Sequence, residues 1–223
     1  MYRWLRSRLR TVYERRLEAT INDPPKHVAV IQDGNRRYAR RHGADPTDGH
    51  RAGADTTEQV LNWCQQFGIE ELTLYAFSTE NFERPPEERE AIFDLIAAKL
   101  REFADADRVH DNQVAVRAIG DRTRLPERVQ DAIAYAERRT AGYDSFRLNA
   151  ALAYGGRDSL LSAARSIAAD AQAGALDPTE IDVETVECRL YDAPVRDVDL
   201  IIRTGGERRT SNFLPWHATG NEA

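Results

Sequence analysis

Five short apolar segments, each closed by a polar or glycine-rich turn, constrain the fold of this chain most strongly. They cover residues 27–32, 72–77, 114–119, 146–153 and 198–202. Helical patterning occupies residues 53–67, 87–106, 126–140 and 159–173 between them, and a further helix is expected to begin near Arg36. Short continuous apolar runs are typical of strands buried on both faces of a parallel sheet. The alternation predicts an α/β fold, a single domain with a mainly parallel central β-sheet flanked by helices.

The beginning of the chain has a different pattern from the rest. Residues 1–24 are expected to form a basic amphipathic helix, and residues 25–223 the single domain. This helix could dock on the domain, or rest on a membrane surface with Trp4 at the interface, and the sequence leaves both readings open. We find no apolar run of about 20 residues and no secretory signal, so we expect a cytoplasmic protein, with peripheral membrane contact as the open alternative.

Charge and cysteine usage narrow the class of protein. The net charge of −6 argues against a nucleic-acid partner, which would usually require a basic surface. Lys26 and Lys99 are the only lysines, so almost all positive charge sits on arginine, whose planar fork suits phosphate oxygens. Cys64 and Cys188 lack metal-ligand spacing, and we expect two buried, reduced thiols.

The first turn with chemical content is residues 33–37, Asp-Gly-Asn-Arg-Arg. Gly34 lets backbone N–H groups approach a ligand, and Arg36 and Arg37 add charged forks, which together suit a phosphate group. Asp33 would repel such an anion unless a cation lay between them, as Mg²⁺ does when carboxylates and phosphate oxygens share it. Asp33 could equally cap the following helix, and the local sequence does not decide between the two roles.

A second arginine- and glycine-rich turn, residues 203–212, follows the last predicted strand. In a parallel sheet the carboxyl ends of the strands meet at one edge, so both turns are expected on the same rim. Two anion-binding turns indicate two phosphorylated substrates, or one with distant phosphates. The motifs GxxxxGK[ST], GxGxxG and GxSxG are absent, which argues against a P-loop protein, a dinucleotide-binding protein and a serine hydrolase.

The longest motifs resemble those of the cis-prenyltransferase, or undecaprenyl diphosphate synthase, family, and the form DGNRRYA is closest to archaeal and eukaryotic members. The matching segments, in family order, are HVAVIQDGNRRYA (27–39), GHRAG (49–53), LTLYAFSTENFERP (72–85), RAIGD (117–121), LNAALAYGGR (148–157) and DLIIRTGGERRTSNFLPW (199–216). The resemblance implies a Mg²⁺-dependent homodimer with a hydrophobic tunnel, whose wall would include the helix around residues 91–100. Its substrates would be isopentenyl diphosphate and an allylic diphosphate, farnesyl or geranylgeranyl, and its product a long polyprenyl diphosphate for a glycosyl-carrier lipid.

The resemblance also implies roles for individual residues. Asp33, His50 and Asn81 match catalytic positions, and Asp33 and Glu222 match metal ligands. The matched substrate-binding positions are Gly34, Asn35, Arg36, Arg37, Tyr38, Phe77, Ser78, Glu80, Phe82, Arg84, Arg203, Arg209 and Ser211. Asp33, Asn81 or the diphosphate itself could accept the proton that leaves isopentenyl diphosphate.

One departure concerns the end of the chain. The family continues past the position of Glu222 with a strand, a helix and a basic tail, whereas this sequence stops at Ala223. We therefore expect that a C-terminal tail is missing. The alternative is a subunit of a heteromeric cis-prenyltransferase that needs a partner's tail.

Overall fold

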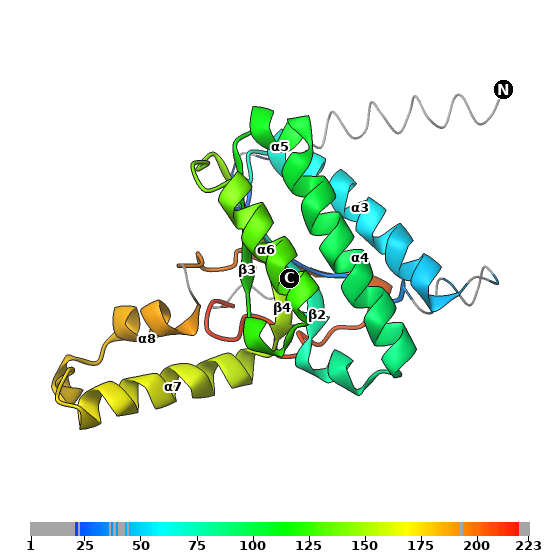
Figure 1. Cartoon of the computed structure of the whole chain (residues 1–223). Helices are drawn as coiled ribbons and strands as arrows, with labels where there is room; N and C mark the ends of the chain where they lie inside the picture. The colour runs from blue at the N-terminus through cyan, green and yellow to red at the C-terminus, as the bar shows by residue number, and fades with distance from the viewer. Residues whose placement is uncertain are drawn as a thin grey trace.

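A five-stranded, fully parallel sheet forms the centre of the molecule, in the order β3-β4-β2-β1-β5 (Figure 1). The computed structural model describes residues 21, 23–35, 37, 39, 43, 45–191 and 194–218, without the side chains of 46–52, 54, 55 and 58. The strands are β1 (His27–Ile31), β2 (Glu71–Ser78), β3 (Val114–Ile119), β4 (Phe146–Tyr154) and β5 (Leu200–Arg203). The predicted α/β fold with a parallel sheet is confirmed.

Two groups of helices cover the two faces of this sheet (Figure 1). The helices are α3 (Pro46–Gln66), α4 (Pro86–Asp105), α5 (Asp107–Asp111), α6 (Glu127–Arg139), α7 (Gly156–Gln172) and α8 (Val183–Leu190). In β1, Val28 and Val30 pack towards α3, whereas Ala29 and Ile31 pack with residues of α7 and α8. This alternation explains the continuous apolar run, because successive side chains of a strand point to opposite faces and both faces are covered.

Most predicted elements agree with the structure to within a few residues, and the differences have local causes. Helix α3 begins at Pro46, before the predicted Gly53, because proline is well suited to the first turn of a helix. The short helix α8 was not predicted. Cys64 is buried as expected, but Cys188 is exposed on α8, so the prediction of a second buried thiol is wrong. Residues 1–20 of the expected N-terminal helix, and most of the helix expected near Arg36, lie outside the described residues, while residues 21, 23 and 24 are described and are not helical.

A polar network crosses the amino ends of β1, β2 and β4. His27 Nδ1 lies 2.7 Å from the Arg196 carbonyl, so Nδ1 carries the proton and Nε2 accepts from the Thr73 hydroxyl at 2.8 Å. The Asn149 amide donates to Thr73 at 3.0 Å and to Glu71 at 2.6 Å.

In the described part of the chain, no helix has the length and apolarity that crossing a bilayer requires.

Candidate active site

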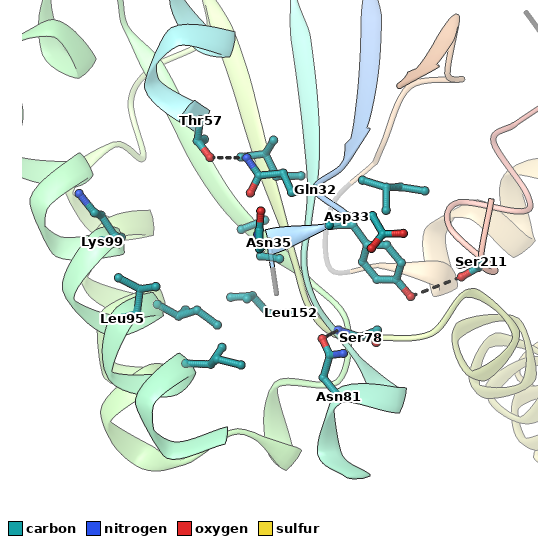
Figure 2. A pocket seen from close by; sticks show the side chains of 18 of the residues that line it. Gln32, Asp33, Asn35, Thr57, Ser78, Asn81, Leu95, Lys99, Leu152 and Ser211 are labelled. Atoms are coloured by element: carbon teal, nitrogen blue, oxygen red, sulfur yellow. Dashed lines mark hydrogen bonds between the residues drawn. The ribbon is translucent and has the colours of Figure 1, made fainter. Parts of the chain in front are cut away.

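A cavity of about 680 Å³ opens at the carboxyl ends of β1, β2 and β5 and extends along α4. The polar part of its lining consists mainly of Asp33, Asn35, Arg37, Ser78, Asn81, Arg203, Arg209 and Ser211. The apolar part includes Leu74, Ile92, Leu95, Ile96, Leu100, Leu148, Ala150 and Leu152. Figure 2 shows Leu95 across the cavity from Asp33 and Ser211. A charged region that adjoins an apolar one suits a ligand with an anionic head and a hydrocarbon chain.

Asp33 and Arg203 meet at the polar end of this cavity. Asp33 Oδ2 accepts from Arg203 Nη2 at 2.8 Å and from Nε at 3.3 Å, while Arg37 Nη2 lies 3.8 Å away. Partial burial raises the pKa of Asp33, but hydrogen bonds from Arg203 and the Gly34 backbone, with the charges of Arg203 and Arg37, lower it overall. Asp33 is therefore held as a carboxylate beside two guanidinium groups.

The two anion-binding turns predicted from sequence touch each other. Arg37 Nη2 donates to the Gly205 carbonyl at 3.0 Å, and the Thr204 hydroxyl donates to the Asp33 carbonyl at 2.7 Å. Gly205 has φ +87°, and a Cβ there would come within 2.8 Å of Arg37 Nη2 and 3.1 Å of the Asp33 carbonyl oxygen. A side chain at residue 205 would be strained at this φ, would displace the Arg37 guanidinium and would crowd the Asp33 backbone, so this glycine allows the two turns to form one continuous cradle.

Arg203 also fixes the loop that follows it. Its Nη1 donates to the Ser211 hydroxyl at 2.6 Å and to the Arg209 carbonyl at 2.5 Å. Ser211 and Asn212 have φ +50° and +61°, a conformation that is costly without glycine and needs support from its surroundings. Part of that support is the ring of Tyr75, which stacks on Phe213 with centroids 4.5 Å apart.

Ser78 and Asn81 face the same cavity from the end of β2 (Figure 2). The Ser78 N–H donates to Asn81 Oδ1 at 3.0 Å, which fixes the amide and leaves its NH₂ group to donate to a ligand. Glu80 and Arg84 also line the cavity, and Arg84 Nη1 lies 2.5 Å from Glu88 Oε1.

Other predicted residues lie elsewhere. Phe77 and Phe82 pack edge to face, with centroids 5.0 Å apart, in a core cluster with Phe93. Neither ring is part of the cavity lining, so the structure places them behind the wall. Arg36, Tyr38, Glu222 and the side chain of His50 lie outside the described residues, and their roles stay predictions.

Comparison with known proteins identifies the family. The family model described as "Putative undecaprenyl diphosphate synthase" matches residues 31–223. The tritrans,polycis-undecaprenyl-diphosphate synthase (geranylgeranyl-diphosphate specific) of Halobacterium salinarum is 69% identical over 212 residues, covering 95% of this chain and 70% of that protein. The chain belongs to the undecaprenyl diphosphate synthase, or cis-prenyltransferase, family. The predicted family and the predicted class of prenyl-transferring enzyme are thereby confirmed.

Solved structures agree with this assignment. Lavandulyl diphosphate synthase of Lavandula x intermedia, in complex with dimethylallyl diphosphate, has a TM-score of 0.82 and 38% identity, covering 86% of this chain and 83% of its own. A probable undecaprenyl diphosphate synthase of Campylobacter jejuni has a TM-score of 0.71 and 34% identity, covering 90% and 84%.

In this cis-prenyltransferase, sequence reasoning missed several cavity residues. The Gln32 amide donates to the Thr57 hydroxyl at 2.9 Å and to the Gly53 carbonyl at 3.1 Å, which ties β1 to α3 (Figure 2). Tyr75 also lines the cavity, although its place in a buried strand hid it from a search for polar clusters. Gln32 could have been predicted as a cavity residue, because it lies directly before Asp33 at the end of a strand.

The cradle fits a divalent cation. A carboxylate offers about four lone-pair directions, and in Asp33 two donors of Arg203 and the Gly34 N–H occupy part of them. Mg²⁺ is commonly held by one or two carboxylates together with phosphate oxygens, so Asp33 could supply the first carboxylate. The second predicted ligand, Glu222, lies outside the described residues.

Proposed function

We propose that this chain condenses isopentenyl diphosphate with geranylgeranyl diphosphate and repeats the step to form a long polyprenyl diphosphate for a glycosyl-carrier lipid. One observation carries the proposal: the Asp33–Arg203 pair, 2.8 Å apart, stands at the mouth of an apolar cavity. The headgroups would bind in the cradle and the growing chain along α4. Geranylgeranyl diphosphate is preferred over farnesyl diphosphate because the Halobacterium salinarum relative is named as specific for it.

The proposed reaction requires little from the protein beyond binding and charge. The C1–O bond of the allylic substrate breaks and the diphosphate leaves with the electron pair. A bond forms between this C1 and C4 of isopentenyl diphosphate, and a proton leaves C2. Arg37 and Arg203 would stabilise the charge that develops on the leaving group, and the shared cradle would hold both substrates together.

The acceptor of that proton follows from the contacts of the two protein candidates. The oxygen of Asn81 already accepts from the Ser78 N–H, and an amide is a very weak base. In the substrate complex Asp33 would bind the cation, and a carboxylate bound to a divalent cation is a weaker base than a free one. Of the three acceptors that the sequence left open, we therefore favour the departing diphosphate. Asn81 would then position substrate through its NH₂ group.

Mg²⁺ would be held by Asp33 together with diphosphate oxygens, and when bound it would neutralise charge on the leaving diphosphate. Before substrate arrives, the guanidinium of Arg203 pairs with the same carboxylate. We infer that Arg203 turns from Asp33 to a diphosphate when the substrates and the cation enter.

We further propose that the enzyme is a homodimer. Leu161, Ile181 and Val183 are 54%, 40% and 61% exposed on the α7–α8 side, and a second copy would cover them. The amphipathic pattern of residues 1–24 supports peripheral contact with the membrane in which such a lipid product would reside.

The test is incorporation of labelled isopentenyl diphosphate into long products by the purified chain, with geranylgeranyl or farnesyl diphosphate as primer. We expect incorporation that requires Mg²⁺, is stopped by a chelator, and falls about 1000-fold in Asp33→Ala. Asp131→Ala, which removes an exposed carboxylate of α6, is the matched control and should retain activity. Full activity in Asp33→Ala would overturn the proposal. Turnover that appears only after a homologous partner is added would instead favour the heteromeric alternative.

A further inference from the structure

Three potential metal ligands gather away from the catalytic cavity. Glu187 of α8, Asp197 before β5 and His217 near the end of the described chain each offer one ligand atom, and these atoms lie within 4.8 Å of one another. Asp197 precedes β5, whereas Arg203 ends it, so the cluster and the diphosphate cradle lie towards opposite ends of this strand. None of the three residues lines the catalytic cavity.

His217 supplies an independent sign that something binds here. Its side chain is 1% exposed, and its Nδ1 atom has no hydrogen-bond partner in the described part of the chain. A buried polar atom without a partner costs about 1–3 kcal/mol, so buried imidazoles are ordinarily satisfied. The ring itself is well fixed, because it packs against Tyr191 with centroids 5.6 Å apart.

The two carboxylates of the cluster have no arginine or lysine partner in the described part of the chain. Glu187 accepts from the Trp216 indole N–H at 3.3 Å, and within the described residues neither Glu187 nor Asp197 forms an ion pair with arginine or lysine. The arginines closest in sequence pair elsewhere: Arg189 with Asp170 at 2.8 Å and Arg196 with Glu70 at 2.9 Å. Two negative charges beside an imidazole without a hydrogen bond at Nδ1 form an environment that attracts a cation.

We propose that Glu187, Asp197 and His217 bind a divalent transition-metal ion of the Zn²⁺ class. Ligand atoms around a tetrahedral zinc ion lie about 3.4 Å apart, given bond lengths of about 2.1 Å, so small side-chain rotations would close the site. Imidazole with carboxylates favours Zn²⁺, whereas Mg²⁺ prefers oxygen ligands alone. Water would complete the coordination.

The site would join three segments that are distant in the chain. It would tie α8 to the segment before β5 and to the residues that follow the Ser211 loop, which is the loop of residues 207–212 after β5. The Val198 N–H already donates to the His217 carbonyl at 2.9 Å, so two of the three segments are joined by a hydrogen bond without the ion. Metal binding at this site would stabilise the folded chain, and with it the loop that completes the cradle.

The test measures Zn²⁺ binding to the full, tag-free chain after dialysis against a chelator. We expect one equivalent of Zn²⁺ in the wild type, and affinity at least about tenfold weaker in Asp197→Asn and in Glu187→Gln. Glu184→Gln, an exposed carboxylate on the same helix, is the matched control and should bind as the wild type does. Mg²⁺ should not compete at equal concentration.

Asp197 is exposed, so its asparagine variant should fold, and its melting temperature without metal serves as the check. At the same Zn²⁺ concentration, the melting temperature of the wild type and of Glu184→Gln should rise more than that of Asp197→Asn. Prenyl transfer with Mg²⁺ should remain in Asp197→Asn, which separates this site from the catalytic one. Equal Zn²⁺ binding by all variants, or no binding by the wild type, would overturn the proposal.

Discussion

The two ends of the same sheet use polar side chains in opposite ways. At the amino end, His27, Glu71, Thr73 and Asn149 are at most 2% exposed and bond to one another across three strands. At the carboxyl end, Asp33 and its arginine partners surround an open cavity. The first arrangement satisfies most of its donors and acceptors internally, although Asn149 Oδ1 is an exception. In the second arrangement, charged groups of a ligand can replace the present partners of the carboxylate and the guanidinium groups.

This contrast shows that a polar cluster is not by itself a binding site. Buried polar groups at the amino end must be bonded, because an unpaired one in a low-dielectric interior is costly. The cradle at the carboxyl end can keep hydrogen-bond donors and acceptors without protein partners, because water can reach them. Substitutions at the amino end should therefore change stability, and substitutions at the carboxyl end should change catalysis.

Among the substitutions that compare the two ends of the sheet, the largest effect is expected for Arg203→Ala. This change removes the donor group that contacts Asp33 and Ser211, and kcat/KM for isopentenyl diphosphate should fall about 100- to 1000-fold. Steady-state kinetics with varied isopentenyl diphosphate measures this fall. Arg147→Ala, which removes the partner of Glu71 at the other end of the sheet, should lower stability and keep the kcat/KM of the folded enzyme. Similar kinetic losses in both variants would remove the distinction between the two ends.

A smaller effect, on stability, is expected for Thr73→Val. The substitution keeps the shape of the side chain but leaves His27 Nε2 without its donor and Asn149 with one bond fewer. The free energy of unfolding should fall by about 1–3 kcal/mol, measured by urea denaturation. The kcat of the folded variant should match that of the wild type, and a selective loss of kcat would show that the network takes part in catalysis.

The pH dependence of stability should also reflect the amino end. Burial lowers the pKa of His27 below its ordinary value of 6.5, more than the nearby charge of Glu71 raises it. The folded state then binds this proton less well than the unfolded state, so stability is complete above pH 6.5 and falls as the pH drops below it. Urea denaturation at pH 7.5 and 5.5 measures the fall, which His27→Gln should reduce. An unchanged slope in that variant would assign the effect to other groups.

The smallest effect is expected for Tyr75→Phe at the carboxyl end. The single hydroxyl proton is shared between the Tyr154 carbonyl at 3.4 Å and the Ser211 carbonyl at 3.5 Å, so both contacts are long and weak. The ring stacking on Phe213 would remain, and the free energy of unfolding should change by only about 0.5 kcal/mol. A loss above about 2 kcal/mol in thermal or urea denaturation would mean that the hydroxyl, rather than the ring, supports the Ser211 loop.

Sequence patterns located the parts of the site better than the contacts between them. The five strands and the turns after them were recognisable because apolar runs and glycine-rich turns are local features. Helix α8 escaped because an eight-residue helix gives little periodicity to detect. Phe77 and Phe82 were expected near the substrate; they pack with Phe93 and are not part of the cavity lining, so that role stays a prediction.

By itself the sequence determined the parallel α/β fold and the family, and it predicted that the turns at residues 33–37 and 203–212 bind anions. Only the tertiary structure decided that Asp33 and Arg203, 170 residues apart, bond directly, and that His217 lies beside Glu187 and Asp197. The reason is physical: the period of a strand or helix is set by neighbouring residues, whereas contacts between distant turns depend on the order in which strands pair. Here β1 lies between β2 and β5, and that order brings the two turns together.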